Sequence, residues 1–525
     1  MASEFGALSI VPPLLAIGLA ILTRKAVLSL FLGIWSGAVI YTRSLGIVQT
    51  FDWIVAAVAG DFHVRILVFT LLLGSGVAMI WNLGGSYAVR DWAIAKLDTQ
   101  RKAGAVAWLL GVVLFFDDYA NTAIVGSAMK DVSDHLRISR EKLSYIVDST
   151  AAPVATLGIS SWVAFQLSLI TEGYEAAGVA DHPPAFEVFL NSIPFNMYSI
   201  LAIVMVAIIV ATGRDYGEML DAEHRSWRTG QVSREDARPM QDVKSDLGEP
   251  SASNPRLVNF FVPIAVLVVV TIASALWTGY APGASLMDMV TGADFASALI
   301  YGSFAMVLSG FVLGKLYGIL TLGEATDTTI DGFGLMLTAI SILVLAWGIG
   351  EVVSALQTGE YVAAIVGESF PIAILPALVL VLAAFIAFST GTSWGTMGIL
   401  TPIVIPVAWN LTGDHTIIAA MVGVIFSGAI FGDHSSPISD TTVLSSTFTG
   451  ADLIDHVRTQ IYYAITVALV AVVLLLVWGA TRITPLALLP VGVAVLYGLV
   501  YGLSEWDADR KGIDSVAVDA PDADD

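Results

Sequence analysis

Cysteine is absent from this chain of 525 residues, which excludes disulfides, thiolate metal sites and cysteine nucleophiles. Charge is also scarce. Only 13% of the residues are charged and 56% are hydrophobic, whereas soluble domains carry about 25% charged residues. The sequence contains neither a Gly-x-x-x-x-Gly-Lys-Ser/Thr nucleotide loop nor a His-Glu-x-x-His zinc motif. These absences favour a membrane protein that is not an enzyme and that needs no cofactor.

Long apolar runs dominate what is present. Many windows approach the roughly 20 apolar residues that cross a bilayer, for example 258–276 and 461–478. The fold class we predict is an all-α polytopic membrane protein with about 11 spanning helices. Residues 7–22 lack a basic leader and a convincing cleavage site, so we expect a first membrane helix rather than a cleaved signal peptide, within a segment 1–25.

The distribution of basic residues predicts the orientation, because Lys and Arg are retained on the cytoplasmic side. With the N-terminus outside and the C-terminus in the cytoplasm, only three basic residues fall outside: Arg43, Arg65 and Arg482. We therefore expect a multi-pass protein of the plasma membrane. The net charge of −21 and the acidic tail 504–525 favour a halophilic source, since net charge maintains solubility in high salt. An ordinary acidic tail is the alternative.

Two apolar segments are interrupted by polar residues. Segment 103–129 is broken at 116–122 and has basic residues at both ends. Each half is about 13 residues, or ~20 Å of helix, which is too short to cross the membrane. We expect a re-entrant hairpin from the cytoplasmic side. Segment 370–412 is broken at 389–396 and has no basic residue at either end, so we expect a hairpin that enters from outside.

The predicted elements form an inverted repeat of hairpins and broken helices, a pattern that marks the binding site of secondary transporters. Each hairpin precedes a broken helix, 145–170 in the first repeat and 416–448 in the second. The predicted segments are repeat one (26–213), a cytoplasmic loop (214–256), a linking helix (257–294), repeat two (295–479) and a terminal helix (480–503).

The polar interruptions supply the candidate site. A carboxylate at the bilayer centre costs about 2.5–3.5 kcal/mol on insertion scales, so intramembrane Asp is a functional-site candidate. No Lys or Arg lies between Lys315 and Arg458, which leaves the acids of that region without a basic partner in sequence. Oxygen ligands of this kind suit a small hard cation. The candidate residues are Asp117, Asp118, Asn121, Thr122, Asp148, Ser149, Thr150, Ser389, Thr390, Thr392, Ser393, Asp433, His434, Ser435, Ser436, Asp440 and Thr441.

We expect Na⁺ at a subset of these residues: Asp118, Asn121, Ser149, Thr390, Asp433 and Ser436. Structural alternatives stay open, because Asp148 to Thr150 resemble a helix cap and Ser389 to Ser393 resemble hydroxyls that pack helices together. Glu351 lies either in the membrane or at its outer interface, and the sequence does not distinguish the two.

Three motifs resemble the NhaC-type sodium/proton antiporter family, within the ion-transporter superfamily of inverted-repeat carriers. They are Phe115-Phe-Asp-Asp-Tyr-Ala-Asn-Thr122, Ser139-Arg-Glu-Lys-Leu-Ser-Tyr-Ile-Val-Asp-Ser-Thr-Ala-Ala-Pro-Val154 and Phe431-Gly-Asp-His-Ser-Ser-Pro-Ile-Ser-Asp-Thr-Thr442. The resemblance spans roughly residues 60 to 480. It implies a cation-coupled secondary transporter with a scaffold and a moving transport domain. It decides less about the substrate, because relatives exchange carboxylates or amino acids.

The leading hypothesis is exchange of cytoplasmic sodium for external protons, which compete for the same carboxylates. A sodium- or proton-coupled carrier of an organic solute (an amino acid or a carboxylate) is the rival, and it needs a further pocket near Trp162, Trp347 or Trp394. An intramembrane aspartyl protease built on Asp117 and Asp433 fits the many hydroxyls poorly. The expected partners are the bilayer, sodium ions and protons, with no nucleic acid. A homodimer is one option for the assembly.

Overall fold

The computed structural model describes residues 5–23, 25–94, 96–115, 118–158, 160–179, 181–239, 250–252, 254–358, 361 and 371–516. Within these residues the regular elements are all helices. Seven of the helices are long and apolar enough to cross a membrane, and the number rises to nine if each of two bent helix pairs counts as one span. The predicted fold class, a polytopic helical membrane protein of the transporter type, is confirmed.

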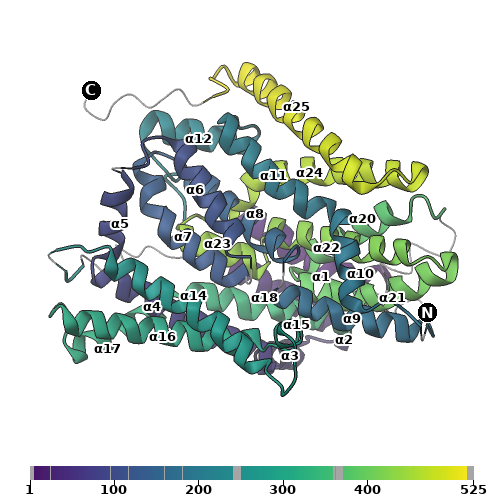
Figure 1. Cartoon of the computed structure of the whole chain (residues 1–525), viewed down its shortest axis with the longest axis horizontal. Coiled ribbons are helices and arrows are strands. Elements are labelled where there is room, and N and C mark those ends of the chain that lie inside the picture. The colour runs from purple at the N-terminus through teal and green to yellow at the C-terminus, as the bar shows by residue number, and fades with distance from the viewer. Residues whose placement is uncertain are drawn as a thin grey trace.

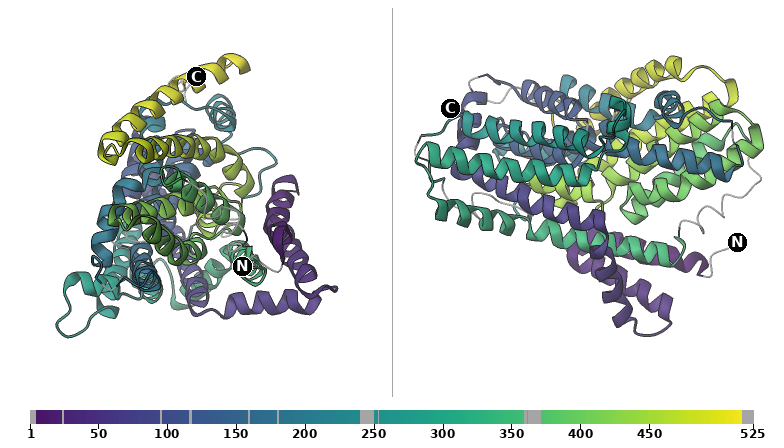
Figure 2. Two further views of the ribbon diagram at one scale, coloured as in Figure 1. Left: turned by 90° about the vertical axis from the view of Figure 1, so that its right-hand side faces the viewer. Right: turned by 60° about the horizontal axis from the view of Figure 1, so that its bottom comes forward.

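One group of helices, here called the flanking unit, lies along one side of the molecule (Figures 1 and 2). Its core is a cluster of buried side chains that includes Leu30, Phe69 and Met336. Its helices are α1 (Val11–Thr23), α2 (Ala26–Thr42), α3 (Ile47–Ala59), α4 (Asp61–Asn82), α5 (Gly85–Ile94), α14 (Val258–Thr278), α15 (Leu286–Thr291), α16 (Phe295–Leu316), α17 (Leu322–Leu335) and α18 (Leu337–Ala355).

The remaining helices form the site unit, which has a separate and larger hydrophobic core around Phe426 and Tyr198. Its helices are α6 (Gln100–Val113), α7 (Asp118–His135), α8 (Arg140–Ala155), α9 (Ser161–Ala176), α10 (Ala185–Ser192), α11 (Met197–Thr212), α12 (Glu218–Thr229), α20 (Leu375–Thr390), α21 (Ser393–Thr412), α22 (His415–Ser435), α23 (Asp440–Thr449), α24 (Leu453–Thr481) and α25 (Pro485–Lys511).

Both interrupted segments fold as pairs of helices that end in the middle of the molecule. The pair α6–α7 enters from one end of the molecule and the pair α20–α21 from the opposite end (Figure 1). The second turn forms because Gly391 takes a positive φ of 69°, which glycine adopts without steric cost. Thr392 then caps α21 by accepting from the Gly395 N–H at 3.2 Å. The two pairs therefore agree with the predicted hairpins.

The two broken helices are α8–α9 and α22–α23. The first break lies between Ala155, the last residue of α8, and Ser161, the first residue of α9. Pro153 stands in the last turn of α8, and Ser160 caps α9 by accepting from the Val163 N–H. The second break covers 436–439 and contains Pro437, which cannot donate a helical hydrogen bond. Helix α22 runs through the interior, since 83% of its apolar window is buried. Irregular backbone at this depth is therefore surrounded by protein, as the low-dielectric setting requires.

Several short helices occupy segments that the sequence pattern left as connections. Helix α3 follows α2 after a sharp bend of 119°, which the positive φ values of Arg43 (53°) and Gly46 (63°) permit. Helix α12 lies within the predicted loop 214–256 and packs on α8 and α24. Amphipathic helices of this kind lack the long apolar run on which the prediction relied. The predicted boundaries of the repeats stay a prediction.

Candidate functional site

The two hairpin tips and the two helix breaks meet at the centre of the site unit. Asp118, in the first turn of α7, faces the Thr441 hydroxyl in the first turn of α23 at 3.5 Å. At the other tip, the Ser436 hydroxyl donates to the Phe388 carbonyl at 2.8 Å. The rings of Trp162 and Trp394 lie 5.9 Å apart and join α9 to α21. Segments more than 300 residues apart in sequence thus share one centre.

Asp433 sits at the second break and binds hydroxyl groups from the residues that follow it. The Ser439 hydroxyl donates to Asp433 Oδ1 at 2.8 Å, and the Thr441 hydroxyl donates to Oδ2 at 2.9 Å. Because the same Thr441 hydroxyl also lies near Asp118, it stands between two buried carboxylates. We call Asp118 and Asp433 the carboxylate pair, and the Thr441 hydroxyl its bridging hydroxyl.

At the carboxylate pair, some buried oxygen atoms accept no hydrogen bond from the protein. Within the described part of the chain, Asp118 Oδ1 and Asn121 Oδ1 are buried and have no hydrogen-bond partner. No Lys or Arg forms an ion pair with Asp118 or Asp433 among the described residues. A buried carboxylate without a counter-charge is costly, so the pair favours an added proton or cation. Among the described residues no group of three His, Cys, Asp or Glu is arranged for a metal ion, so a bound cation would draw on hydroxyl and amide oxygens as well.

Asp148 belongs to a second, fully bonded network beside the pair. Its Oδ1 accepts from Ser445 at 3.0 Å, and its Oδ2 accepts from Thr442 at 3.3 Å and from the Gln460 amide at 3.0 Å. His456 Nε2 lies 3.7 Å from the same oxygen. Neutral donors thus surround this carboxylate on both oxygens, which distinguishes it from Asp118.

His434 contributes to the same network from the end of α22. Its ring nitrogens meet the Ser149 hydroxyl at 3.4 Å and the hydroxyl of Tyr198 in α11. Its carbonyl accepts from Gln460. The network therefore connects α8, α11, α22 and α24 behind the carboxylate pair.

The other predicted residues have mainly local roles. The Asn121 amide donates to the Gly111 and Thr150 carbonyls at 2.7 and 3.0 Å, which fixes the first hairpin against α8. The hydroxyls of four candidates donate to backbone carbonyls of their own helix: Thr122, Thr150, Thr390 and Ser435.

The remaining candidates differ in their burial and in their hydrogen-bond partners. Ser389 is buried and its hydroxyl has no partner among the described residues, while Ser393 is buried in the first turn of α21. Glu351 lies half-buried on α18 of the flanking unit, and no hydrogen bond or ion pair in the described part of the chain joins it to the carboxylates. Asp117 lies outside the described residues.

The structure adds residues that the candidate set omitted: Tyr119, Tyr198, Ser439, Thr442, Ser445, His456 and Gln460. Ser439 and Thr442 lie inside the motif that already carried the prediction. Gln460 and His456 stand at the start of an apolar helix, where a polar side chain is a detectable signal.

Comparison with known proteins agrees with the transporter fold described above. The Na⁺/H⁺ antiporter family matches residues 154–480. An uncharacterised protein of Haemophilus influenzae is 33% identical over 475 residues, which cover 88% of each chain. The malate-2H⁺/Na⁺-lactate antiporter of Bacillus subtilis is 31% identical over 185 residues, or 35% of this chain and 37% of that one. The Na⁺/H⁺ antiporter NhaC of Alkalihalophilus pseudofirmus is 31% identical over 105 residues, or 20% of this chain and 22% of that one.

Proposed function

This chain belongs to the Na⁺/H⁺ antiporter family, and we propose that it exchanges cytoplasmic sodium for external protons across the plasma membrane. The observation that carries the proposal is the pair Asp118 and Asp433, bridged by the Thr441 hydroxyl at 3.5 and 2.9 Å. Two buried carboxylates without a basic partner bind a cation or a proton in place of a fixed counter-charge. Na⁺ is the transported ion here and not a resident cofactor.

Competition for the pair explains obligatory exchange. When Na⁺ binds, the oxygens of Asp118, Asp433 and Thr441 neutralise and coordinate it, and Asn121 Oδ1 offers a further unpartnered acceptor. When a proton binds, one carboxyl becomes neutral and the Thr441 hydroxyl stays bonded. Each loaded form lowers the cost of moving the charge through a low-dielectric region, whereas the empty dianionic form is held back by that cost.

The orientation follows from the charge distribution of the sequence. The open end of the first hairpin carries Arg101 and Lys102, and α12 with its basic residues packs at the same end of the molecule (Figure 1). We assign this end to the cytoplasm under the rule that basic residues stay inside. The N-terminus is then outside and the C-terminus inside.

Purified protein in sodium-loaded proteoliposomes tests the proposal. An outward sodium gradient should drive proton entry, recorded as acidification of an internal pH dye. Asp433→Asn should reduce the exchange rate by at least about 100-fold, because it removes one of two carboxylates that carry the exchanged charge. Asp327→Asn, on the exposed face of α17, is the matched control and should exchange at the wild-type rate. Wild-type exchange by the Asp433→Asn variant would refute the proposed site.

An organic-solute carrier is the second candidate, and one observation favours it. Trp162, Trp394 and Phe165 form an aromatic group beside the second hairpin tip, with ring centroids 5.9 and 4.8 Å apart. The indole of Trp162 lies close to the Asp118 side chain, so this aromatic group adjoins the carboxylate pair. The similar Bacillus subtilis protein is described as exchanging malate and lactate.

The two candidates differ in what must be present for ion movement. Sodium-driven proton movement in liposomes that contain no organic solute supports the antiporter. Proton movement that appears only after lactate, malate or an amino acid is added supports the carrier.

A further inference from the structure

Two backbone carbonyls at the second break lack their helical donors. In an α-helix each carbonyl accepts from the N–H four residues further along the chain. The Asp433 carbonyl would need an N–H at Pro437, and proline has none. The His434 carbonyl would need the N–H of Ile438, which lies beyond Ser435, the last residue of α22. A buried carbonyl without a donor is costly, so other groups must donate to both.

Two side chains supply these donors. The Asp433 carbonyl accepts from the Thr442 hydroxyl at 3.1 Å and from the Ser436 N–H at 3.4 Å. The His434 carbonyl accepts from the side-chain amide of Gln460. Thr442 belongs to the same motif as the break, whereas Gln460 lies on the next helix, α24. Gln460 therefore ties the break to a part of the chain outside the motif.

The partners of the Gln460 amide fix its orientation. A backbone carbonyl can only accept, so the amide nitrogen faces His434, and the same nitrogen lies 3.0 Å from Asp148 Oδ2. The amide oxygen accepts from His456 Nε2 at 2.8 Å. Gln460 is fully buried, and rotation of its amide would break all three hydrogen bonds. The donor at the break is therefore held in one position.

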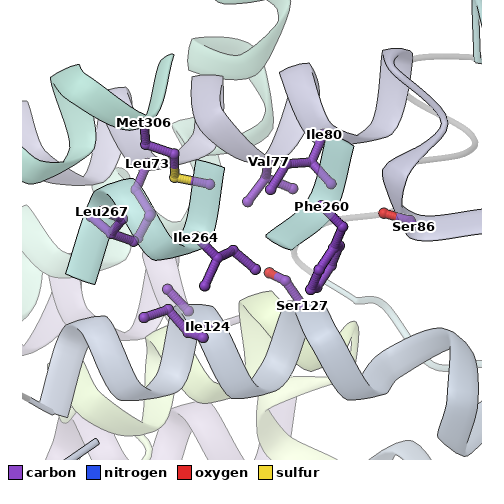
Figure 3. Close-up of a pocket in the computed structure, with 11 residues that line it drawn as sticks. Leu73, Val77, Ile80, Ser86, Ile124, Ser127, Phe260, Ile264, Leu267 and Met306 are labelled. Atoms are coloured by element: carbon purple, nitrogen blue, oxygen red, sulfur yellow. The ribbon is translucent and has the colours of Figure 1, made fainter. Parts of the chain in front are cut away.

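The helix of Asp118, α7, contacts both an apolar hollow and the segment directly after the break. Ile124 and Ser127 of α7 line the hollow (Figure 3). A void removes dispersion partners from its lining, so the hollow fixes the position of α7 less than a packed core does. The Tyr119 hydroxyl of α7 donates to Oδ2 of Asp440, the first residue of α23, at 2.6 Å. Both members of the carboxylate pair thus depend on how the break is held.

We propose that Gln460 is a positioning residue that fixes the second break and so orients Asp433 for the cation. The proposal rests on the proposed function and adds to it the residue that holds the ligand in place. Gln460 acts through the backbone, because its contact at the break is the carbonyl of His434, the residue after Asp433. Loss of a group that orients a metal ligand from behind typically costs about 10–100-fold in affinity or activity.

Gln460→Met tests the proposal, because methionine keeps an unbranched side chain and removes the amide. In sodium-free detergent solution, amide hydrogen exchange of the segment 433–442 should become about fivefold faster, since a hydrogen bond that restrains the segment is lost. In proteoliposomes the KM for sodium should rise about tenfold or more. The maximal rate per folded protein should stay within about twofold of the wild type, because only the binding of the ion is weakened.

Tyr463→Phe is the matched control, one turn further along α24 and also fully buried. It removes a hydroxyl that donates to Asp215 at 2.6 Å elsewhere in the site unit. Hydrogen exchange of 433–442 and the KM for sodium should both stay within about twofold of the wild type, as for sites that share no partners. Gln460→Asn, whose amide sits on a shorter side chain, is the second test variant and supports both comparisons if Gln460→Met does not fold.

Unchanged hydrogen exchange of the break in a folded Gln460 variant would overturn the positioning role. Faster exchange with an unchanged KM for sodium would overturn it as well, because the break would then be held without any effect on the cation. An equal rise of KM in Asp148→Asn would assign the effect to Asp148 and would also overturn it. Absence of sodium-driven exchange by the wild-type protein would count against the proposed function, and hydrogen exchange would still decide whether Gln460 holds the break.

Discussion

The side-chain amide of Gln460 donates to Asp148 Oδ2 at 3.0 Å and joins the start of α24 to the middle of α8. Both residues are fully buried. Ser445 and Thr442 of α23 donate to the same carboxylate, so three helices meet on one side chain. We therefore propose that Asp148 fixes the framework that holds the carboxylate pair; the sequence analysis grouped it with the candidate cation ligands and left a helix cap as the alternative.

Asp148→Asn should destabilise the protein more than it weakens sodium binding. The new amide places an N–H₂ group among three donors, and a buried donor left without an acceptor costs about 1–3 kcal/mol. We expect a clear fall in the thermal unfolding midpoint in detergent, with a sodium midpoint close to that of the wild type. An unfolding midpoint equal to that of Asp327→Asn, an exposed control, would argue against the framework role.

Within the site unit, a buried ion cluster fastens α12 to α8. Lys142 Nζ lies 2.6 Å from Asp215 and 3.3 Å from Glu223, and all three side chains are less than 10% exposed. Lys142→Met should cost about 3–5 kcal/mol, because it leaves two buried carboxylates without their counter-charge. The exposed pair Lys102–Asp98 provides the control, and Lys102→Met should have little effect.

The destabilisation by Lys142→Met should depend on pH. Burial raises the pKa of Glu223, and the Lys142 ammonium opposes that rise. Without the ammonium the folded-state pKa rises further above the unfolded value. A carboxyl of this kind loses stability as pH increases from the unfolded pKa to the folded pKa. Denaturation at pH 5 and pH 8 should therefore show the larger loss at pH 8; an equal or larger loss at pH 5 would contradict this assignment.

The two hairpins should open to opposite sides of the membrane. Leu411, near the end of α21, and Lys102, near the start of α6, are both exposed. The two hairpins, α6–α7 and α20–α21, lie toward opposite ends of the molecule (Figure 1). An impermeant maleimide added to intact cells should label Leu411→Cys and leave Lys102→Cys unlabelled until the membrane is permeabilised. Labelling of both variants in intact cells would rule out the proposed orientation.

Much of the fold could be predicted from hydrophobic runs and their interruptions. The hairpins and breaks could be predicted because a charged residue (Asp118) and two helix breakers (Gly391 and Pro437) interrupt apolar segments that would otherwise continue as helices. The contact between Asp433 and Thr441 is also local in sequence, because both residues lie in one short motif. Local sequence signals specify these features directly.

The sequence alone does not predict which distant side chains form hydrogen bonds with one another. Tyr119 and Asp440 are 321 residues apart, and no periodicity links positions at that separation without an alignment. Asp118 and Asp148 look alike as acids in apolar segments, but their donors come from distant helices and differ in number. Helix α3 was missed because an amphipathic segment after a bend has no spanning run.

The dependence of sodium affinity on pH tests the central claim, that sodium and protons compete for Asp118 and Asp433. If one proton is displaced, the apparent sodium dissociation constant should rise about tenfold per unit fall in pH below the pKa of the site. Asp118→Asn should flatten that dependence, whereas Asp327→Asn should not. A wild-type sodium affinity that stays constant between about pH 5 and pH 9, the range in which buried carboxylates titrate, would contradict competition at a shared site.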